Sequence, residues 1–295
     1  MTIAKVAVNI DNDKVEELSL AYEVVGDAGR AWALTPGGRF SKEYPGVREL
    51  AVALAELGNR VLIYDRPNTG ESDVCFTGST ESAMQADALA ALLSHLDFTP
   101  AVSIGGSGGA RVSLLSASRH PDVVNGLGVW MMSGGAFGLM NIGVGYCGAS
   151  IAAVWNGGME AVTAIPEETL GNWQEVMRRN PSNRQKLLSQ NPREFRNTMV
   201  RWLGAYCPCD GLIPGLADAD VLGMDRPALV VRSGESDPYH TRETSEQLAR
   251  ALPNAQLTEP PWEDTEWIDS KIGFRFVNWY RLAPILNDWA NKVLA

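Results

Sequence analysis

The chain has 295 residues, of which 45% are hydrophobic and 20% are charged, and its formal net charge is −10. These values are typical of a globular protein and exclude a chain that is disordered over most of its length. The acidic balance also argues against nucleic acid or an anionic membrane as a partner, because both require clustered Lys and Arg to neutralise phosphates.

The chain begins with a predicted β-hairpin, formed by 5–10 and 18–25 around the polar turn Asp11-Asn12-Asp13. Beyond residue 30, short apolar runs alternate with amphipathic helical patterns. The predicted strands are 31–35, 60–65, 101–105, 127–132, 227–232 and 255–259, and the predicted helices are 47–57, 83–96, 109–120, 241–252 and 283–294. This alternation indicates an α/β fold, with a mostly parallel sheet of about eight strands that is flanked by helices on both faces.

The alternation stops between Gly134 and Met224, where the pattern is helical. We therefore expect a core made of 1–133 and 225–295, with a helical cap (lid) inserted at 134–224. The large apolar side chains of this region are open to two interpretations, as the lining of an apolar substrate pocket or as ordinary helix packing. They are Met132, Met140, Trp155, Met159, Trp173, Trp202 and Tyr206.

The stretch from Val123 to Met159 has no charged residue and is long enough to cross a membrane. It also holds many glycines and polar residues such as Ser133, and no Lys or Arg closely flanks it. A buried strand followed by a tightly packed insertion explains the stretch better than a membrane span. The N-terminus has no signal-peptide pattern, so we expect a cytoplasmic protein that does not enter the membrane.

Four cysteines are too few for a disulfide framework, and they are Cys75, Cys147, Cys207 and Cys209. The last two stand two positions apart, which does not match the C-x-x-C spacing of zinc or redox sites. We expect ordinary thiols in a reducing compartment, and we expect no metal and no cofactor. The sequence leaves open whether Cys207 and Cys209 have a special role.

The strongest local motif is G-x-S-x-G, between the predicted strand 101–105 and the predicted helix 109–120. It reads Gly105-Gly106-Ser107-Gly108-Gly109. In such a nucleophile elbow a sharp strand-to-helix turn raises the serine hydroxyl above the sheet, and side chains at the two outer glycines would collide with the neighbouring strand and helix. The amide of Gly108, at the helix N-terminus, stands where the oxyanion of a tetrahedral intermediate would form. The motif predicts that Ser107 is a nucleophile.

Two nucleotide-binding motifs also use a glycine-rich turn, and this sequence lacks the residues that both require. A dinucleotide-binding fingerprint that starts at Gly106 needs glycine or alanine at position 111, where this chain has Arg111. The Gly-Lys-Ser/Thr of a phosphate-binding P-loop is also absent from the sequence. A turn with only a structural role stays an alternative.

With this motif the chain resembles the α/β-hydrolase superfamily, from about residue 31 to 132 and from 227 to the end. The stretch 65–73 is similar to the family's segment after its fourth strand. The turn at 35–39 stands where the family has the turn with the second oxyanion amide, which implies that role for Gly38. A strand followed by Gly-x-x-Asp gives the family's triad acid, which implies Asp237. The neighbouring Arg39 either binds a substrate carboxylate or caps the loop.

The chain departs from the family at the catalytic histidine, which normally follows the last strand. No histidine follows His240 in this sequence, and His95 and His120 are expected at helix ends. His240 stands three residues after Asp237, on a loop at the carboxyl edge of the sheet, where open α/β sheets have their active sites. It is equally a candidate general base and a loop residue that helps to start the next helix. Glu263, close to the family's histidine position, is the alternative base, but it would need burial to raise its pKa.

Two functions follow from these residues. The first is a serine-dependent hydrolase that cleaves a small, largely apolar ester, lactone, thioester or β-diketone through an acyl-enzyme, with water as co-substrate. The second keeps the fold but has no hydrolytic turnover, and instead binds a small molecule or performs lyase-like or oxygenase-like chemistry. The position of His240 relative to Ser107 and Asp237 discriminates between them. A small molecule is the expected partner, and a homo-oligomer is left open.

Overall fold

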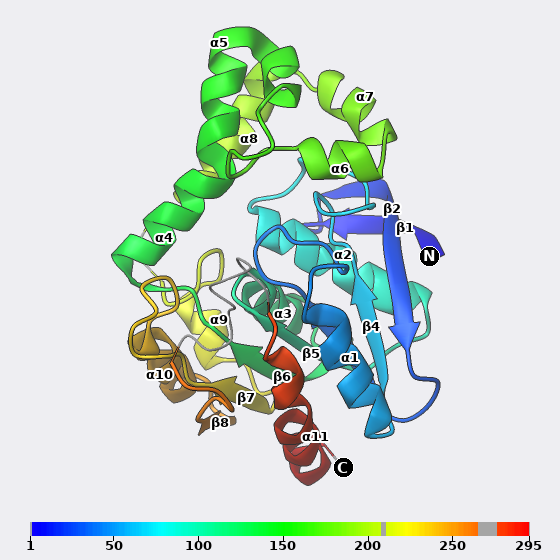
Figure 1. Cartoon of the computed structure of the whole chain (residues 1–295), viewed down its shortest axis with the longest axis vertical. Helices are drawn as coiled ribbons and strands as arrows, with labels where there is room; N and C mark the ends of the chain where they lie inside the picture. The colour runs from blue at the N-terminus through cyan, green and yellow to red at the C-terminus, as the bar shows by residue number, and fades with distance from the viewer. Residues whose placement is uncertain (1, 208–210, 265–275, 295) are drawn as a thin grey trace.

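A computed structural model describes residues 2–207, 211–264 and 276–294 of the chain. Its centre is an eight-stranded sheet in the order β1-β2-β4-β3-β5-β6-β7-β8 (Figure 1). Strands β1 and β2 pair antiparallel, β2 also pairs antiparallel with β4, and all other pairs are parallel. The strands are β1 (Thr2–Ile10), β2 (Lys14–Val25), β3 (Ala31–Thr35), β4 (Arg60–Tyr64), β5 (Ala101–Gly106), β6 (Val124–Trp130), β7 (Ala228–Val231) and β8 (Ala255–Thr258). The predicted mostly parallel sheet is confirmed.

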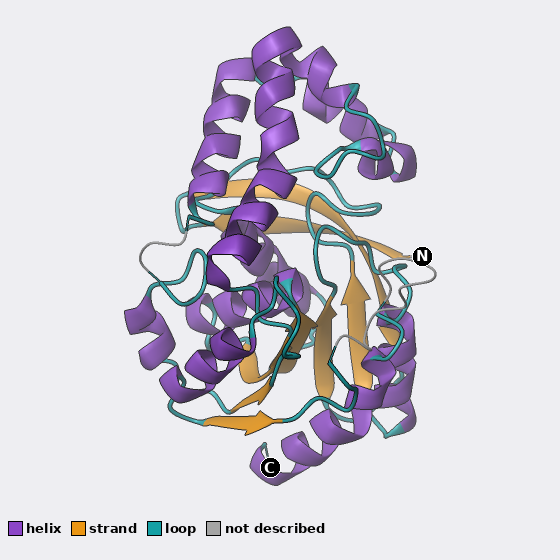
Figure 2. Cartoon of the chain, turned by 60° about the vertical axis from the view of Figure 1, so that its left-hand side comes forward, coloured by secondary structure: helices purple, strands orange, loops and turns teal. Residues whose placement is uncertain are grey.

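Helices cover both faces of the sheet, as the sequence predicts (Figure 2). One face carries α1 and α11, and the other carries α2, α3 and α10. Their bounds are α1 (Val47–Glu56), α2 (Glu81–His95), α3 (Gly108–Arg119), α10 (Arg242–Ala251) and α11 (Leu282–Val293), the last preceded by a short 3₁₀ turn, η2 (Trp279–Arg281). Every predicted helix of the core is present, with its bounds within two residues of the expected ones.

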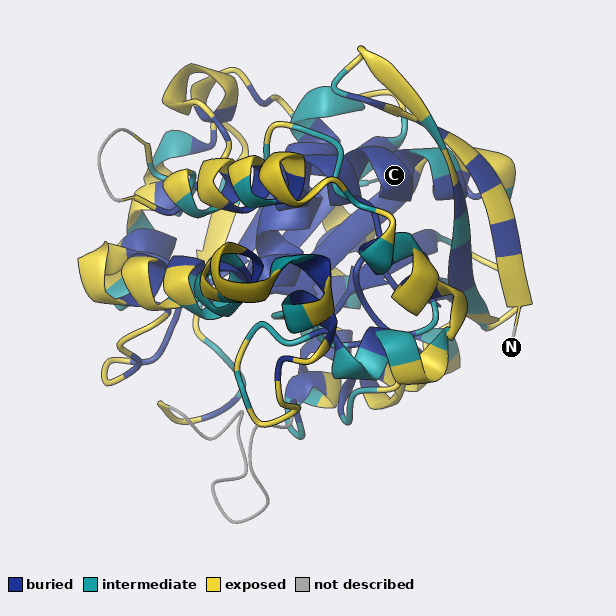
Figure 3. Cartoon of the chain, turned by 90° about the horizontal axis from the view of Figure 1, so that it is seen from above, coloured by how far each residue is buried: buried dark blue, intermediate teal, exposed yellow. Residues whose placement is uncertain are grey.

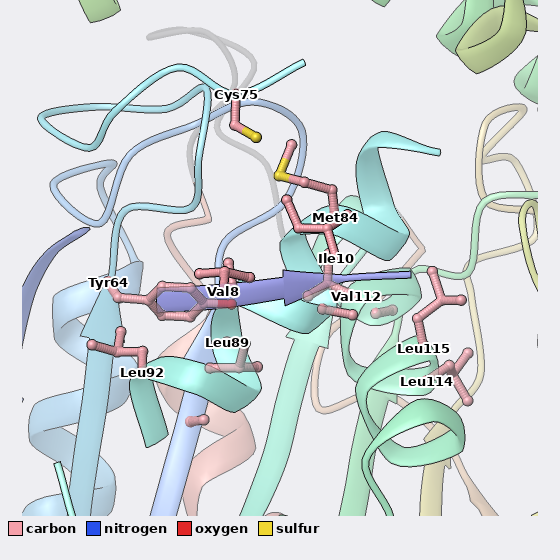
Figure 4. Packing of buried hydrophobic residues seen from close by; sticks show 14 of the residues in the cluster. Val8, Ile10, Tyr64, Cys75, Met84, Leu89, Leu92, Val112, Leu114 and Leu115 are labelled. Carbon is pink, nitrogen blue, oxygen red and sulfur yellow. The ribbon is translucent and has the colours of Figure 1, made fainter. Parts of the chain in front are cut away.

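The two sides of each central strand supply two separate cores. In β3 the side chains of Trp32 and Leu34 join the cluster under α1 and α11, whereas Ala31 and Ala33 face the cluster under α2 and α3. This division follows from the two-residue repeat of a strand, whose successive side chains point to opposite faces. Figure 4 shows part of the second cluster, where residues of β1, β4, α2 and α3 pack together.

The predicted N-terminal hairpin is confirmed, and it forms the edge of the sheet. Strand β1 pairs with β2 from Thr2 to Ile10, and the turn between them has positive φ at Asp11 (52°) and Asn12 (56°). Asp and Asn tolerate this conformation better than most residues because their short side chains bond locally. Side chains of β1 alternate between buried and exposed, as the banding of the edge strand in Figure 3 shows.

Strands β1 and β2 begin three and four residues earlier than predicted, and β6 differs from its prediction at both ends. The apolar run predicts a strand at 127–132, but β6 runs from Val124 to Trp130. Met131 has a positive φ of 49°, which an extended strand does not accommodate, so the strand ends before it. Met131 and Met132 are nevertheless buried, since the chain continues inside the molecule beyond the strand end.

The chain between β6 and β7 is helical, and most of its helices stand above the sheet in Figure 1, at the end toward which the arrow of β4 points, whereas α9 lies lower in this view. They are α4 (Gly135–Gly143), a π-helical turn η1 (Val144–Gly148), α5 (Ala149–Thr163), α6 (Gln174–Arg179), α7 (Ser182–Leu188), α8 (Pro192–Gly204) and α9 (Asp218–Leu222). This segment therefore lies over the carboxyl ends of the parallel strands, where the loops that carry the candidate site residues also lie.

Within the described residues, one helical stretch, Gly135–Thr163, is apolar and long enough to cross a membrane on those two criteria alone. In the fold it consists of α4, η1 and α5, and its angles are non-helical at Gly157 and Gly158. A side chain at Gly138 would touch the backbone of Tyr239, and one at Gly143 would touch Tyr206. The glycines of this stretch thus allow close packing against the rest of the fold.

Candidate active site

Ser107 sits on the turn between β5 and α3, with φ 55° and ψ −118°. A positive φ at a residue other than glycine is strained, and such strain at a strand-to-helix turn is the geometry of a nucleophile elbow. The turn is held by its own backbone, because the amide of Ser107 donates to the carbonyl of Trp130 and its carbonyl accepts from the amide of Arg111. The Ser107 side chain is partly exposed.

The outer glycines of the motif are required by the packing predicted for them. A Cβ atom on Gly109 would lie 2.1 Å from the carbonyl oxygen of Thr35, on the neighbouring strand β3. One on Gly105 would lie 2.7 Å from the backbone carbon of Gly109, in the helix. Only glycine at both positions lets helix α3 start directly above the strands.

His240 lies between Ser107 and Asp237. Its Nε2 atom is 2.9 Å from the Ser107 Oγ atom, and its Nδ1 atom is 2.8 Å from Oδ2 of Asp237. The structure therefore brings together the three residues that the sequence proposed as nucleophile, base and acid. Both imidazole contacts are within the distance expected of a working base and its orienting carboxylate.

The Asp237 carboxylate binds both the backbone of its own turn and the His240 ring. Its Oδ1 atom accepts the backbone amides of Tyr239 and His240, at 3.0 and 3.1 Å, while Oδ2 bonds the imidazole. Burial alone would raise the pKa of this carboxyl, but the bonds from His240 and the two amides outweigh it and hold the pKa below its usual range. An ionised carboxylate can only accept, so the imidazole proton resides on Nδ1 and Nε2 is free to accept the Ser107 proton.

Gly38 and Gly108 lie together beside the serine. A Cβ atom built on Gly108 would be 3.1 Å from the amide nitrogen of Gly38. The amide of Gly108 is the first of helix α3, and the first amides of a helix have no partner within it. The two residues predicted to form the oxyanion hole are thus adjacent, with Gly38 held in a left-handed conformation (φ 49°).

Two arginines fix the turn that carries Gly38. The buried Arg66 donates from Nη2 to the carbonyls of Gly37 and Gly38, at 3.3 and 2.6 Å. Arg39 forms a bidentate ion pair with Glu81, on helix α2. Its guanidinium also lies over the rings of Tyr146 and Trp173. The carboxylate of Glu81 therefore already binds two of the Arg39 nitrogens that could otherwise bind a substrate carboxylate.

Two residues near Ser107, Ser133 and Arg111, were missed by the sequence reasoning, whereas Tyr206 was among the residues named as a possible pocket lining. The Oγ atom of Ser133 lies 3.4 Å from that of Ser107 and accepts a bond from Nη1 of Arg111 at 3.0 Å. Nη2 of Arg111 donates to the hydroxyl of Tyr206 at 3.2 Å. Arg111 had been noted only as the residue that breaks a nucleotide fingerprint. The sequence signal that could have identified Arg111 is a single charged residue that follows two glycines and an alanine in the first turn of a helix that is mostly buried.

The remaining candidates are exposed, lie at helix ends or serve packing. Glu263, the alternative base, has an exposed side chain. His95 is exposed at the end of α2, and His120 caps α3 while its ring bonds Asp87. Of the large apolar side chains named for the insertion, Trp155 is 72% exposed, whereas Tyr206 bonds Arg111.

Neither thiol nor metal chemistry is indicated among the described residues. Cys75 and Cys147 are buried free thiols, and burial raises the pKa of both to about 11, whereas Cys207 is exposed. Cys209 lies outside the described residues. In the described part of the chain, no group of three His, Cys, Asp or Glu side chains is placed to hold a metal ion.

Comparison with known proteins places this geometry in a family. Solved structures with the same fold include a thermophilic esterase from Thermogutta terrifontis with malate bound (22% identity, TM-score 0.61, all of both chains covered). They also include Est816, an N-acyl homoserine lactone degrading enzyme (20%, 0.57, 96% and 99%), and the enol-lactonase from Burkholderia xenovorans LB400 (18%, 0.58, 98% and 100%). No significant match was found among curated proteins. The model of the alpha/beta hydrolase family matches residues 26–268, and the chain therefore belongs to that family.

Proposed function

We propose that this protein is a serine-dependent hydrolase of small esters or lactones, with Ser107 as nucleophile, His240 as general base and Asp237 as the acid that orients it. The observation that carries the proposal is the position of the His240 ring, which bonds both partners. A histidine that pointed to solvent would have favoured the alternative of binding or non-hydrolytic chemistry.

The reaction would proceed in two halves. His240 takes the proton of Ser107 as the oxygen attacks the substrate carbonyl, and the amides of Gly38 and Gly108 stabilise the oxyanion. The protonated imidazole then donates to the leaving alcohol, which leaves an acyl-enzyme on Ser107. In the second half His240 deprotonates water, which attacks the acyl carbonyl, and the imidazolium returns this proton to the Ser107 oxygen as the bond to the acyl group breaks and the acid is released.

The helical insertion 134–224 is proposed to act as the cap of this site. Its residue Tyr206 reaches the Arg111 guanidinium beside the nucleophile, so the insertion helps to form the walls around Ser107. The esterase and the lactone-degrading enzymes among the solved structures of the same fold agree with this substrate class. Thioesters and β-diketones are cleaved by the same sequence of steps and belong in the same screen.

The test is covalent labelling with a fluorophosphonate probe, which reacts with activated serines, followed by intact mass and peptide mapping. We expect one adduct per chain, located on Ser107, and no adduct in Ser107→Ala. Ser79→Ala, which changes an exposed serine at some distance in the chain, is the control and should label like the wild type. A folded wild-type protein that does not label would contradict the proposal.

A further inference from the structure

Positive charge is concentrated inside the protein next to the proposed nucleophile, although the whole chain carries a net charge of −10. Arg66 and Arg111 are 2% and 1% exposed, and Arg39 is largely buried beside them. Glu81 pairs with Arg39, but within the described residues no ion pair joins a carboxylate to Arg66 or Arg111. Burial lowers the pKa of Arg66, and the charge of Arg111 acts in the same direction, which places the two cations near each other.

Arg111 has only neutral partners in the described part of the protein. These are the hydroxyls of Ser133, Tyr206 and Tyr146, and its Nε atom bonds none of the described groups. Tyr206 does not supply a negative charge, because burial raises the pKa of its phenol to about 12. A buried charge without an opposite charge is costly, so a protein that retains one usually has a partner for it. Arg66 differs, because the carbonyls of the oxyanion turn occupy its Nη2 atom.

The Arg111 guanidinium adjoins the space where a substrate would react. A Cβ atom on Gly108 would lie 3.1 Å from the Gly38 amide and 3.6 Å from Nη2 of Arg111, so the guanidinium borders the same space as the oxyanion amides. Ser133 connects the two groups, since its oxygen accepts from Arg111 and lies 3.4 Å from Ser107 Oγ. Because Arg111 donates to a lone pair of Ser133, the hydroxyl of Ser133 keeps a proton that it can donate to Ser107 Oγ or to an acceptor on the substrate.

We propose that Arg111 and Ser133 form an anion subsite, and that the substrate is an ester or lactone with a carboxylate within a few bonds of the scissile carbonyl. The proposal rests on the function proposed above for Ser107. The planar guanidinium fork matches the two oxygens of a carboxylate, and the Ser133 hydroxyl adds a third donor. The short path from Arg111 through Ser133 to Ser107 requires the carboxylate to be close to the reacting carbon.

A purely structural role for Arg111 makes a different prediction. Its bond to Tyr206 ties the helical insertion to helix α3, and this tie would stabilise the fold for every substrate alike. A tie alone therefore gives no preference for acids over neutral molecules of the same shape. Substrate preference, measured as a ratio within one protein preparation, separates the two roles.

The experiment compares two pairs of esters that differ only by a carboxylate in place of an isopropyl group. Monomethyl succinate and methyl 4-methylpentanoate place the difference in the acyl part, and acetoxyacetate and isobutyl acetate place it in the alcohol part. For at least one pair we expect wild-type kcat/KM to favour the acid by about tenfold or more, the value of a charge-assisted hydrogen bond. Arg111→Met should abolish this ratio and Arg111→Lys should retain part of it. Arg250→Met, an exposed arginine of α10, is the control for net charge and should keep the ratio.

Fluorophosphonate labelling of the same preparations separates the possible failures. Wild-type protein that labels on Ser107 but prefers neither acid would overturn the anion subsite and leave the hydrolase proposal standing. Wild-type protein that does not label would overturn the hydrolase proposal itself. If Arg111→Met does not fold, the test is whether small ligands slow labelling of Ser107 in the wild-type protein. Succinate should slow labelling by the neutral probe, whereas succinamide should not. Equal effects of the two ligands would overturn the subsite.

Discussion

His240 and Asp237 come from one short loop after β7, and the same carboxylate that holds the imidazole also accepts the two backbone amides of its turn. The orientation of the proposed base is therefore set locally. Only its contact with Ser107, 133 positions away in the sequence, depends on the global fold. A base on the acid's own loop explains how a member of this family can lack a histidine after its last strand.

Asp237→Asn tests that local arrangement. An amide in place of the carboxylate stabilises the imidazolium poorly and allows the wrong tautomer of the ring. We expect ester hydrolysis to fall by about a hundredfold or more, with a smaller loss in stability, as measured by kcat/KM and by thermal unfolding. Asp288→Asn, an exposed position of α11, serves as the matched control. Activity within a few-fold of wild type in Asp237→Asn would contradict the assignment of the acid.

Individual residues of the site were predictable to very different degrees. Ser107 and Gly108 follow from a local motif, and the steric reason for the motif reappears in the contacts of Gly105 and Gly109. His240 could only be proposed with an equal alternative, because no local pattern shows which way a loop side chain points. Arg111 was missed because its partners, Ser133 and Tyr206, come from distant parts of the chain.

Among the secondary-structure elements, β3, β5 and α3 position Ser107. The backbones of β3 and α3 approach each other so closely at Gly109 that no side chain fits between them. Gly109→Ala would place a Cβ atom 2.1 Å from the carbonyl of Thr35 and force helix α3 away from the sheet. We expect it to destabilise the protein by about 3 kcal/mol and to abolish labelling of Ser107. Gly204→Ala, at the exposed end of α8 where a Cβ meets no atom within 4 Å, should leave both unchanged. A fully stable and reactive Gly109→Ala would show that the contact is looser than described.

Helices α2 and α3 are joined by a buried carboxylate. Asp87 of α2 bonds Arg119 at the end of α3, the His120 ring and the amide of Asp11. Burial would raise the pKa of the Asp87 carboxyl, but these bonds outweigh it and hold the pKa below its usual range. The stabilisation is therefore complete above the unfolded-state pKa of about 3.9 and is lost as the pH falls through the lower folded-state pKa.

Asp87→Asn should accordingly cost about 2 kcal/mol of the free energy of unfolding at neutral pH. The difference from wild type should be largest above about pH 5 and should shrink below about pH 4, as followed by urea unfolding across that range. A difference that does not change with pH would mean that Asp87 contributes through packing rather than through its charge.

The core elements were predictable because their signals are local. Runs such as 31–35 and 101–105 are bounded by proline, glycine or arginine, and each became a strand over the same or nearly the same residues. The limits of β6 were predicted wrongly because apolar character continues through Met131 and Met132, which are buried without being in the strand. Hydrophobicity reports burial, and burial alone does not mark where a strand ends.

In the molecule as a whole, the helical insertion is fastened to the core by buried polar contacts. Asn183 of α7 is fully buried, accepts the amide of Val74, and donates to the carbonyls of Ser72 and Val176. Val74 and Ser72 belong to the core segment after β4. The sequence indicated an insertion from its helical pattern, but it gave no sign of which residues would join the insertion to the core.

Asn183→Ala tests this attachment. It leaves the amide of Val74 and the carbonyl of Ser72 without their partner, and buried groups that lose a hydrogen bond are costly. We expect a loss of about 2–4 kcal/mol in urea unfolding, with faster hydrogen exchange at Val74. Asn141→Ala, an exposed residue whose side chain bonds only within α4, is the control and should change stability by less than about 0.5 kcal/mol. Wild-type stability in Asn183→Ala would contradict the role given to this contact.

The assignment of the general base to His240 is tested most directly by the rate of fluorophosphonate labelling in two variants. His240→Gln removes the only imidazole placed at Ser107, and Glu263→Gln removes the exposed carboxylate near the family's usual histidine position. We predict that labelling slows by about a hundredfold to ten-thousandfold in His240→Gln and stays within twofold of wild type in Glu263→Gln. Unchanged labelling in His240→Gln, or its loss in Glu263→Gln, would contradict a triad of Ser107, His240 and Asp237.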